Sequence, residues 1–458
     1  DSPEPPEEEP PAADLLNPAA VACLIRLVYA RYHREFGEYF GGTIRAIFTD
    51  EPNMLGRLRE RDVVPGTTGI LAYVSDFLGY DFMPYLPALW EDDAASAVYR
   101  QDYHRALEYR LDETYYRQLF GWCEAHGIAL TGHPAEPDDT LHLRHFHMPG
   151  QDIVWRHVEP DAPSALEGRP STQAKAAASL MLHTGRRRNA NEFCGAFGHD
   201  LTFEDMRWLA NWLLVRGCNL LIPHAFYYSV RGPRWHERPP DVGPHSFWWD
   251  TQFTAFAHAC RRLCWLNTDS GQVCHVAILG EHHHLPWRAA KACFQAQIDF
   301  NYLDAADLAR GDLDDGTLRI ASQRYRALIV DGVISPAAQR HLDGLAGRVA
   351  VVQWSDDAAA CIATLKQLLP PAAVSVGAPG LRVRHVRKAG LDWLILFNEG
   401  RAPLQATLDL GDAYALDPAS GSLTPCMGEL SLAGHELCVL ARQAHAARSA
   451  SPGAPPGA

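Results

Sequence analysis

The sequence has 458 residues and a formal net charge of −14, with 41 Lys and Arg residues against 55 Asp and Glu residues. This length suits two to four domains, and 47% hydrophobic with 21% charged residues excludes a generally disordered chain. The acidic balance argues against nucleic acid or an anionic membrane as the partner. No run of residues approaches the ~18 apolar residues that a membrane span needs.

Residues 1–13 are rich in Pro and Glu, so we expect a disordered leader. The eleven cysteines lack the paired spacing of a zinc ribbon or a disulfide scaffold, which predicts free, mostly buried thiols. The compartment cannot be predicted directly, but free thiols favour the cytoplasm over secretion.

Helical patterns alternate with short apolar runs across residues 14–270. Asn17 followed by Pro18 is a plausible start for a helix over 20–36. Long helices are also expected at 99–126 and 203–216. The predicted strands are 43–48, 128–131, 152–155, 190–194 and 219–223. This repeated strand–helix order favours a parallel sheet.

Two smaller units are predicted after the first. Residues 271–377 resemble an amidotransferase-like α/β domain, with strands at 273–279, 327–330 and 348–352; the unit has no Cys-His-Glu arrangement, so we expect it to be structural or oligomerising. Residues 378–443 carry short strands separated by Gly, Asn and Asp turns, which predicts a small β-sandwich. Residues 444–458 are expected to be a disordered tail.

Polar residues follow the predicted strands of the first unit. Glu51, His133 with Glu136, Glu192 and His224 lie at the carboxyl ends of successive predicted strands. In a (β/α)8 barrel, the carboxyl ends of the strands carry the active site. Two carboxylates on separate strands are what glycoside hydrolysis requires, one as a protonated acid and the other as a nucleophile or base.

Glu51 and Glu192 are the candidate catalytic pair. Pro52 forces the chain to turn beside Glu51, and Glu192 lies among small or apolar residues where burial would raise the pKa of a carboxyl group. The alternative is that both residues are ordinary glutamates near strand ends, which cap helices or bind Arg.

Several motifs recur in an order that resembles the catalytic barrel of the glycoside hydrolases grouped around family 106, the α-L-rhamnosidases, and their uncharacterised relatives. The motifs are ThrAspGluPro at 49–52, GlyHisProAlaGlu at 132–136, MetProGlyGlnAsp at 148–152, AsnGluPheCysGlyAlaPheGly at 191–198, LeuThrPheGluAspMet at 201–206 and the stretch 217–249. The resemblance implies a (β/α)8 TIM-type barrel, with 43–48 as its fourth strand and 190–194 as its seventh.

This resemblance also implies roles for the two glutamates. Glu51 corresponds to the acid/base that follows strand four of retaining barrel glycosidases, and Glu192 to the other carboxylate on strand seven. Those enzymes usually have Asn before the acid/base, whereas this chain has Asp50. The rhamnosidase family is regarded as inverting and calcium-dependent, so retention and inversion both stay open. Carboxyl separations of ~5–5.5 Å and ~6.5–9.5 Å, respectively, distinguish them.

The first unit has fewer strands than a whole barrel. Five strands are predicted, whereas a barrel needs eight, and the polar leader is too short to supply three more. We therefore expect strands 4–8 of a barrel that lacks its N-terminal part, which would impair activity if substrate ligands are lost with it.

Further residues are candidates for substrate binding. His133 and His224 would donate hydrogen bonds to sugar hydroxyls, or else be core histidines. Glu136 is a third carboxylate, either activating water or pairing with Arg. Asp50 and Asn191 flank the two candidate catalytic residues and are included as substrate ligands.

Aromatic residues of 217–249 are the remaining substrate-binding candidates. Tyr228 and Trp248 are expected to stack on the apolar face of a sugar ring, with packing beneath the barrel as the alternative.

No metal site is predicted. His282, His283 and His284 form one histidine group, and a second group is His142, His145 and His147. Neither group has a defined carboxylate or cysteine partner at ligand spacing, which favours exposed loops. We expect no cofactor, with calcium as the alternative, because its oxygen ligands leave little trace in a sequence.

The sequence therefore favours an O-glycoside hydrolase acting on an oligosaccharide or polysaccharide, without nucleic acid or membrane partners and with a homo-oligomer as an option. The alternatives are an inactive carbohydrate-binding relative, and a metal-dependent lyase or isomerase on the same barrel. The sugar, anomer and linkage are not predicted.

Overall fold

The computed structural model describes residues 13–56, 63–226, 231–232, 242–409 and 411–443. Among these residues, no helix combines the length and the apolar character needed to cross a bilayer. All eleven cysteines belong to the described residues and are free thiols, as predicted.

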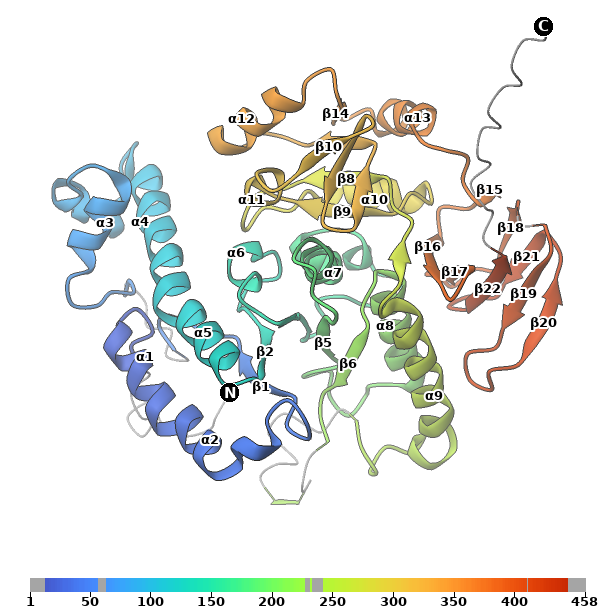
Figure 1. Ribbon diagram of the computed structural model, residues 1–458, viewed down its shortest axis with the longest axis horizontal. Helices are drawn as coiled ribbons and strands as arrows, with labels where there is room; N and C mark the ends of the chain where they lie inside the picture. The colour runs from blue at the N-terminus through green and yellow to red at the C-terminus, as the bar shows by residue number, and fades with distance from the viewer. Residues whose placement is uncertain (1–12, 57–62, 227–230, 233–241, 410, 444–458) are drawn as a thin grey trace, which may run out of the picture.

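The chain begins with a group of helices on one side of the molecule (Figure 1). Asn17 caps the first helix by accepting a hydrogen bond from the backbone N–H of Ala19 at 3.0 Å. The helices of this group are α1 (Pro18–Leu24), α2 (Ala30–Phe36), α3 (Ile70–Leu78), α4 (Ser96–Leu111) and α5 (Arg117–Ala125). A π-helix at Ile25–Tyr29 joins α1 to α2, and another at Asp112–Tyr116 joins α4 to α5. The predicted helices at 20–36 and 99–126 are thus confirmed, each with a π-helical segment inside it.

Short parallel strands then alternate with helices. The strands are β1 (Ala46–Asp50), β2 (Ala129–His133), β3 (Met148–Pro149), β4 (Asp152–Ile153), β5 (Ala190–Phe193) and β6 (Leu220–Pro223). The helices among and after them are α6 (Thr140–Leu143), α7 (Gln173–His183), α8 (Phe203–Val215) and α9 (Trp249–Asn267). The strands form two sheets, β1-β2-β3 and β4-β5-β6, in which every pairing is parallel. This order confirms the predicted strand–helix repeat, although β1 ends two residues later than expected.

Two glycines allow these strands to approach closely. A Cβ atom on Gly132 would lie 1.9 Å from the backbone oxygen of Thr49, and one on Gly150 would lie 1.9 Å from the oxygen of Ala190. Gly132 also has a φ of +122°, which other residues rarely adopt. Glycine at these positions therefore permits the close approach of β1 to β2 and of the β3–β4 junction to β5.

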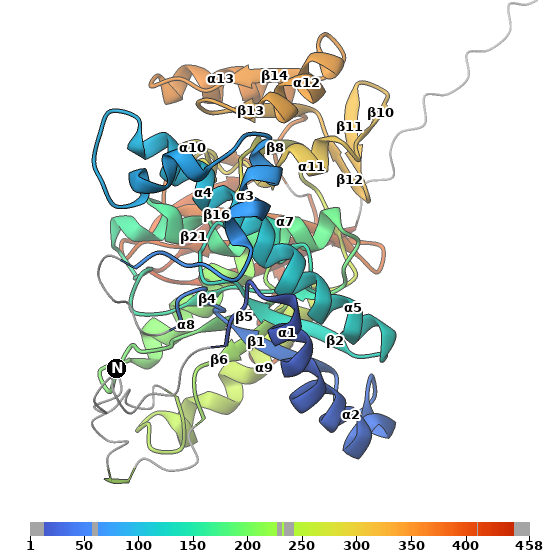
Figure 2. The same cartoon turned by 90° about the vertical axis from the view of Figure 1, so that its left-hand side faces the viewer.

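A third parallel sheet forms the middle of the chain. Its order is β14-β13-β8-β9, from β8 (Val276–Leu279), β9 (Phe300–Leu303), β13 (Ala327–Val330) and β14 (Ala350–Gln353). The accompanying helices are α10 (Trp287–Gln295), α11 (Ala305–Leu308), α12 (Pro336–Leu345) and α13 (Ala358–Leu368). A small antiparallel sheet joins β10 (Asp312–Asp314), β11 (Thr317–Ile320) and β12 (Gln323–Tyr325). Figure 2 shows α12 and α13 on the far side of this unit from β1–β6.

The end of the chain is strand-rich, as predicted. One sheet has the order β20-β19-β22-β17-β16-β7 and the other β15-β18-β21. Their strands are β7 (Gly271–Gln272), β15 (Val374–Val376), β16 (Leu381–Lys388), β17 (Leu391–Asn398), β18 (Leu404–Leu408), β19 (Ala413–Leu416), β20 (Leu423–Cys426), β21 (Glu429–Leu432) and β22 (Leu437–Gln443). Since β7 pairs with β16, residues next to the predicted boundary at 270/271 belong to the last sheet as well as to the connection. The exact domain boundaries stay predictions.

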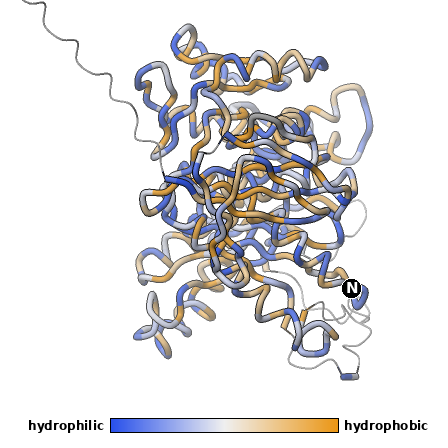
Figure 3. The backbone as a smooth tube through the Cα atoms, turned by 90° about the vertical axis from the view of Figure 1, so that its right-hand side faces the viewer, coloured by the Kyte–Doolittle hydropathy of each residue, from blue (hydrophilic) through white to orange (hydrophobic). Residues whose placement is uncertain are grey.

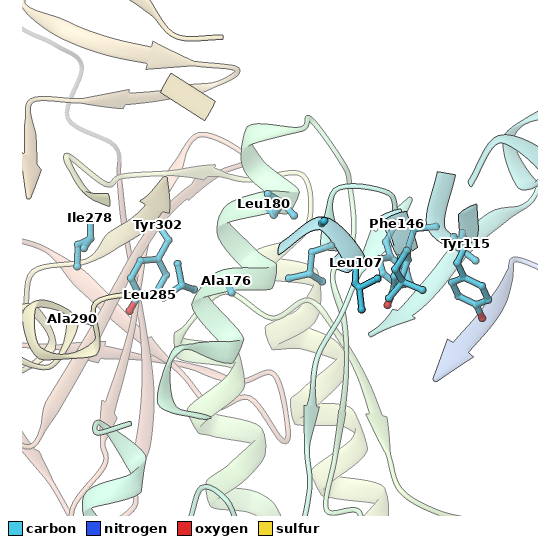
Figure 4. Packing of buried hydrophobic residues seen from close by; sticks show 14 of the residues in the cluster. Leu107, Tyr115, Phe146, Ala176, Leu180, Ile278, Leu285, Ala290 and Tyr302 are labelled. Atoms are coloured by element: carbon cyan, nitrogen blue, oxygen red, sulfur yellow. The ribbon is translucent and has the colours of Figure 1, made fainter. Parts of the chain in front are cut away.

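One apolar core connects the first unit to the middle sheet. It includes Leu107 and Tyr115 from the helical group, Leu180 of α7, and Ile278 and Tyr302 of the middle sheet (Figure 4). In Figure 3, hydrophobic segments run through the interior and hydrophilic ones are frequent in the peripheral loops. The shared core fixes the middle sheet against the strands that carry the candidate site.

Candidate active site

Polar side chains gather at the carboxyl ends of β1–β6. Asp50 is the last residue of β1 and pairs in register with His133, the last residue of β2. Asp152, the first residue of β4, pairs in register with Glu192 of β5. His224 follows β6, and its backbone N–H donates to the oxygen of Phe193 at 2.9 Å. Parallel register thus brings residues that are 19 to 174 positions apart to one end of the two sheets.

His133 lies at the centre of this group and is almost fully buried, with 1% of its side chain exposed. Its Nε2 atom is 3.4 Å from Asp50 Oδ1 and 3.4 Å from Glu192 Oε2. A ligand atom from each of Asp50, Glu51 and His133 lies within 4.8 Å of the others, and the same holds for His133, Asp152 and Glu192. Glu51, which follows β1, and Glu192 of β5 therefore approach the same histidine from two different sheets.

The side chains of this group differ in their exposure to solvent. The side chain of Asp50 is 71% exposed and that of Glu192 is 14% exposed, and Glu51 is also exposed. The Glu192 backbone N–H donates to the oxygen of Gln151 at 2.8 Å, and that of Glu51 donates to the oxygen of His133 at 3.2 Å. Glu192 thus lies in the more buried part of the group and Glu51 at its exposed rim.

Asp152 has the most perturbed carboxyl group of the site. The pKa of Asp152 is raised to about 7, first by burial and then by the nearby carboxylates of Glu192 and Glu51, against the opposing effects of His133 and His224. Its Oδ1 atom is buried without a hydrogen-bond partner among the described residues. A carboxyl group that keeps its proton near neutral pH is typical of acid–base sites.

The pKa of His133 is raised as well. Burial alone would lower it, but the hydrogen bond to Glu192 and the charges of Asp152 and Asp50 raise the pKa above its ordinary value. His224 lies at the other side of Glu192, with its Nε2 atom 4.0 Å from Glu192 Oε1. The candidate site is therefore a set of carboxyl groups of differing exposure around histidines, able to donate and to accept protons.

Two predicted substrate ligands are placed elsewhere. Asn191 is fully buried, and its side-chain amide donates to Asn189 Oδ1 at 2.8 Å and to Cys218 Sγ at 3.0 Å. Because side chains alternate along a strand, the neighbour of Glu192 cannot share its face. Trp248 is 1% exposed and packs against Phe203, so the alternative of aromatic packing is correct for it.

Glu136 takes the Arg-pairing role that was its alternative, with its Oε2 atom 2.9 Å from an Arg169 nitrogen. Tyr228 lies outside the described residues. Asp152 was missed as a site residue, although it ends one of the motifs at 148–152, because its significance depends on burial that the sequence does not display.

The prediction that both histidine groups lie on exposed loops is wrong. His142 is buried and its Nδ1 atom is 2.6 Å from Asp139 Oδ2. His282 and His283 are partly buried and contact the carboxylate of Glu108. Because Glu108 is distant in sequence from His282 and His283, no ligand spacing could reveal that contact.

The donor set around His133 does not match calcium well. Calcium takes six to eight oxygen ligands, whereas the described groups pair two carboxylates each with a histidine nitrogen. The absence of a cofactor stays a prediction.

No family model matches this sequence, and no curated protein matches it. Solved structures do match its fold. A rhamnosidase from Novosphingobium sp. PP1Y aligns over 100% of this chain with a TM-score of 0.71 and 17% identity. A β-galactosidase from Rahnella sp. R3 aligns over 94% of the chain, and 82% of its own, with a TM-score of 0.64 and 9% identity. A GH42 β-galactosidase from G. stearothermophilus aligns over 82% of the chain and 73% of its own, with a TM-score of 0.59 and 10% identity.

These likenesses establish the fold, a mixed α/β architecture shared with TIM-barrel-type glycoside hydrolases and followed by a strand-rich region. The chain spans 50% of the length of the Novosphingobium rhamnosidase. Membership of family 106 in particular stays a prediction.

Proposed function

We propose that this chain is an O-glycoside hydrolase that uses Glu51 and Glu192 as its paired carboxylates, with α-L-rhamnosides as the first substrate class to test. The observation that carries the proposal is the approach of both carboxylates to the buried His133 at the carboxyl ends of parallel strands. Active sites of barrel enzymes are built at that end, and the fold shared with a rhamnosidase and with β-galactosidases supports the same function.

The proposed reaction divides between the two glutamates. Glu51, at the exposed rim, donates a proton to the glycosidic oxygen as the bond from that oxygen to the anomeric carbon breaks. Glu192 either attacks the anomeric carbon or removes a proton from the attacking water. In total one water is consumed, with its hydroxyl on the anomeric carbon and its proton returned to the acid that protonated the leaving group.

Asp152 and His133 have supporting roles in this proposal. Asp152 is in register with Glu192, and a proton on Asp152 avoids two negative charges side by side. His133 orients Glu192 through the 3.4 Å contact and extends towards Asp50 at the rim. His224 contacts Glu192 from the next strand and is proposed to donate to a sugar hydroxyl.

The experiment is a screen of aryl glycosides, α-L-rhamnoside included, with the 458-residue chain, followed by NMR of the first-formed anomer. Release of aglycone with one solvent-derived oxygen in the sugar supports hydrolysis. The anomer formed distinguishes retention from inversion. Sugar binding without turnover would instead support the carbohydrate-binding relative, which is a real alternative because the chain spans half of the Novosphingobium rhamnosidase. Product lacking solvent oxygen would support a lyase or isomerase.

A further inference from the structure

A second group of histidines and carboxylates lies away from the candidate active site, between the first unit and the middle sheet. Glu108 comes from α4, Asp139 caps α6, and His282 with His283 comes from the loop between β8 and α10. One ligand atom from each of these four residues lies within 4.8 Å of all the others. Residues of three segments, 31 to 175 positions apart, thus converge on one point.

The carboxylates of this group are buried among histidines. Glu108 and Asp139 are 7% and 3% exposed. The Glu108 Oε2 atom is 3.6 Å from His282 Nε2 and 3.4 Å from His283 Nε2, and Asp139 Oδ1 is 3.4 Å from His282 Nδ1. Charge-assisted hydrogen bonds from nitrogen to a carboxylate are usually 2.7–2.9 Å long, so these contacts are too long to be good hydrogen bonds.

Two of these separations, from Glu108 Oε2 to His282 Nε2 and to His283 Nε2, fit ligand atoms of one metal ion. Zinc binds nitrogen at about 2.0–2.1 Å and carboxylate oxygen at about 2.0–2.2 Å in tetrahedral sites, which places neighbouring ligand atoms about 3.4 Å apart. In addition, His282 Nε2 and His283 Nδ1 are buried without a hydrogen-bond partner among the described residues. Buried polar atoms are ordinarily satisfied, and an ion bound by His282 Nε2 would satisfy one of the two.

Surrounding contacts hold these residues in place. His142 Nδ1 is 2.6 Å from Asp139 Oδ2, and its Nε2 atom is 3.1 Å from the backbone oxygen of Glu108. The backbone N–H of His283 donates to the backbone oxygen of Asp138 at 3.1 Å, and the ring atom His283 Nδ1 faces Asp138 Oδ1 at 3.8 Å. Carboxylates and carbonyls commonly orient metal-bound histidines and carboxylates in this way.

We propose that Glu108, Asp139, His282 and His283 form a structural site for a divalent transition metal, with zinc as the ion of choice. Two carboxylates and two neutral imidazoles balance the two positive charges of the ion, and four protein ligands complete a tetrahedral shell, as structural zinc sites do. The ion would fasten the loop between β8 and α10 to α4 and α6. It would therefore stabilise the contact between the middle unit and the strands of the candidate active site.

The test uses the full chain, stripped with EDTA, dialysed and titrated with Zn²⁺ alone by calorimetry. The proposal expects one zinc per chain and a melting temperature that rises with added zinc and falls again with chelator, because an ion that binds the folded state stabilises it. Co²⁺ in place of zinc should give the absorption of a tetrahedral site without a thiolate charge-transfer band, which excludes binding by any of the eleven cysteines.

Variants localise the binding. His283→Ala and Glu108→Gln should each weaken zinc binding at least about tenfold, as loss of even an outer-shell partner does, whereas His284→Ala is the matched control because His284 is exposed and next in the chain. No zinc bound by the stripped wild-type chain, a melting temperature unaffected by zinc, a thiolate band with Co²⁺, or unchanged affinity in folded His283→Ala would each overturn the proposal. The wild-type measurements decide the matter even if a variant does not fold.

Discussion

Glu399→Gln tests how the strand-rich region is held against the first unit. Glu399, which directly follows β17, places its Oε2 atom 2.9 Å from Arg216 and 3.2 Å from Arg382. All three side chains are buried, with 0%, 3% and 5% exposure for Arg216, Arg382 and Glu399. Burial lowers the pKa of Arg216 to about 10 despite the opposing charge of Glu399, so the carboxylate compensates much of the cost of burying the guanidinium.

The expected effect is a large loss of stability. Gln keeps the shape and one acceptor oxygen but leaves two buried guanidinium groups without a negative charge. Removal of one partner from a buried pair costs about 3–5 kcal/mol. With a urea m-value of about 3 kcal/mol/M, the unfolding midpoint should fall by about 1 M or more. The assay is urea unfolding followed by far-UV circular dichroism.

The control is Glu35→Gln, since Glu35 pairs with Arg34 at 3.1 Å while both side chains are more than half exposed. Exposed pairs of this kind contribute little, so its midpoint should not move. A loss below about 1 kcal/mol for Glu399→Gln would refute the argument, because it would mean that the buried charges are compensated by something other than Glu399.

Three further predictions concern single residues. Asp152 binds its proton more tightly when folded, with a pKa of about 7 against an ordinary 3.8, so its contribution to stability is present below about pH 4 and is lost as pH rises through about 7. Urea unfolding at pH 5 and pH 8 should therefore show Asp152→Asn gaining on wild type at the higher pH, by about 2–3 kcal/mol, and an unchanged difference would contradict the raised pKa. Trp248→Ala should cost about 3–5 kcal/mol of stability without changing the sugar affinity of the folded fraction, measured by calorimetry; a selective loss of sugar binding would restore Trp248 as a ligand. Gly132→Ala should lower soluble yield and melting temperature sharply, because its Cβ would meet the Thr49 oxygen at 1.9 Å, whereas Gly121→Ala in α5 has nothing within 4 Å and should be tolerated; equal melting temperatures would argue against the close approach.

The sequence predicted the strand–helix order because local patterns determine it. Apolar runs that end in polar residues identified β1, β2, β5 and β6, and with them Glu51, His133, Glu192 and His224. The placement of Asn191 shows what adjacency in sequence does not determine. Asn191 was included because it adjoins Glu192, yet adjacent residues of a strand face opposite sides.

Long-range contacts explain the residues that sequence reasoning missed. The importance of Asp152 depends on its burial beside Glu192, which the apolar run predicted as a strand at 152–155 does not show. The partners of His282 and His283 lie about 140 to 175 positions earlier, on α4 and before α6. Such convergence arises from packing of the middle sheet on the first unit, which no spacing within either segment encodes.

The most direct test of the proposed function compares single-turnover rates and sugar affinities of Glu51→Gln and Glu192→Gln with those of Glu136→Gln, whose side chain is half exposed and paired with Arg169. The paired-carboxylate account predicts that the first two variants lose about 10²- to 10⁴-fold in the rate of aryl glycoside hydrolysis while they still bind sugar, and that Glu136→Gln keeps the wild-type rate. Wild-type rates in Glu51→Gln or Glu192→Gln would contradict it.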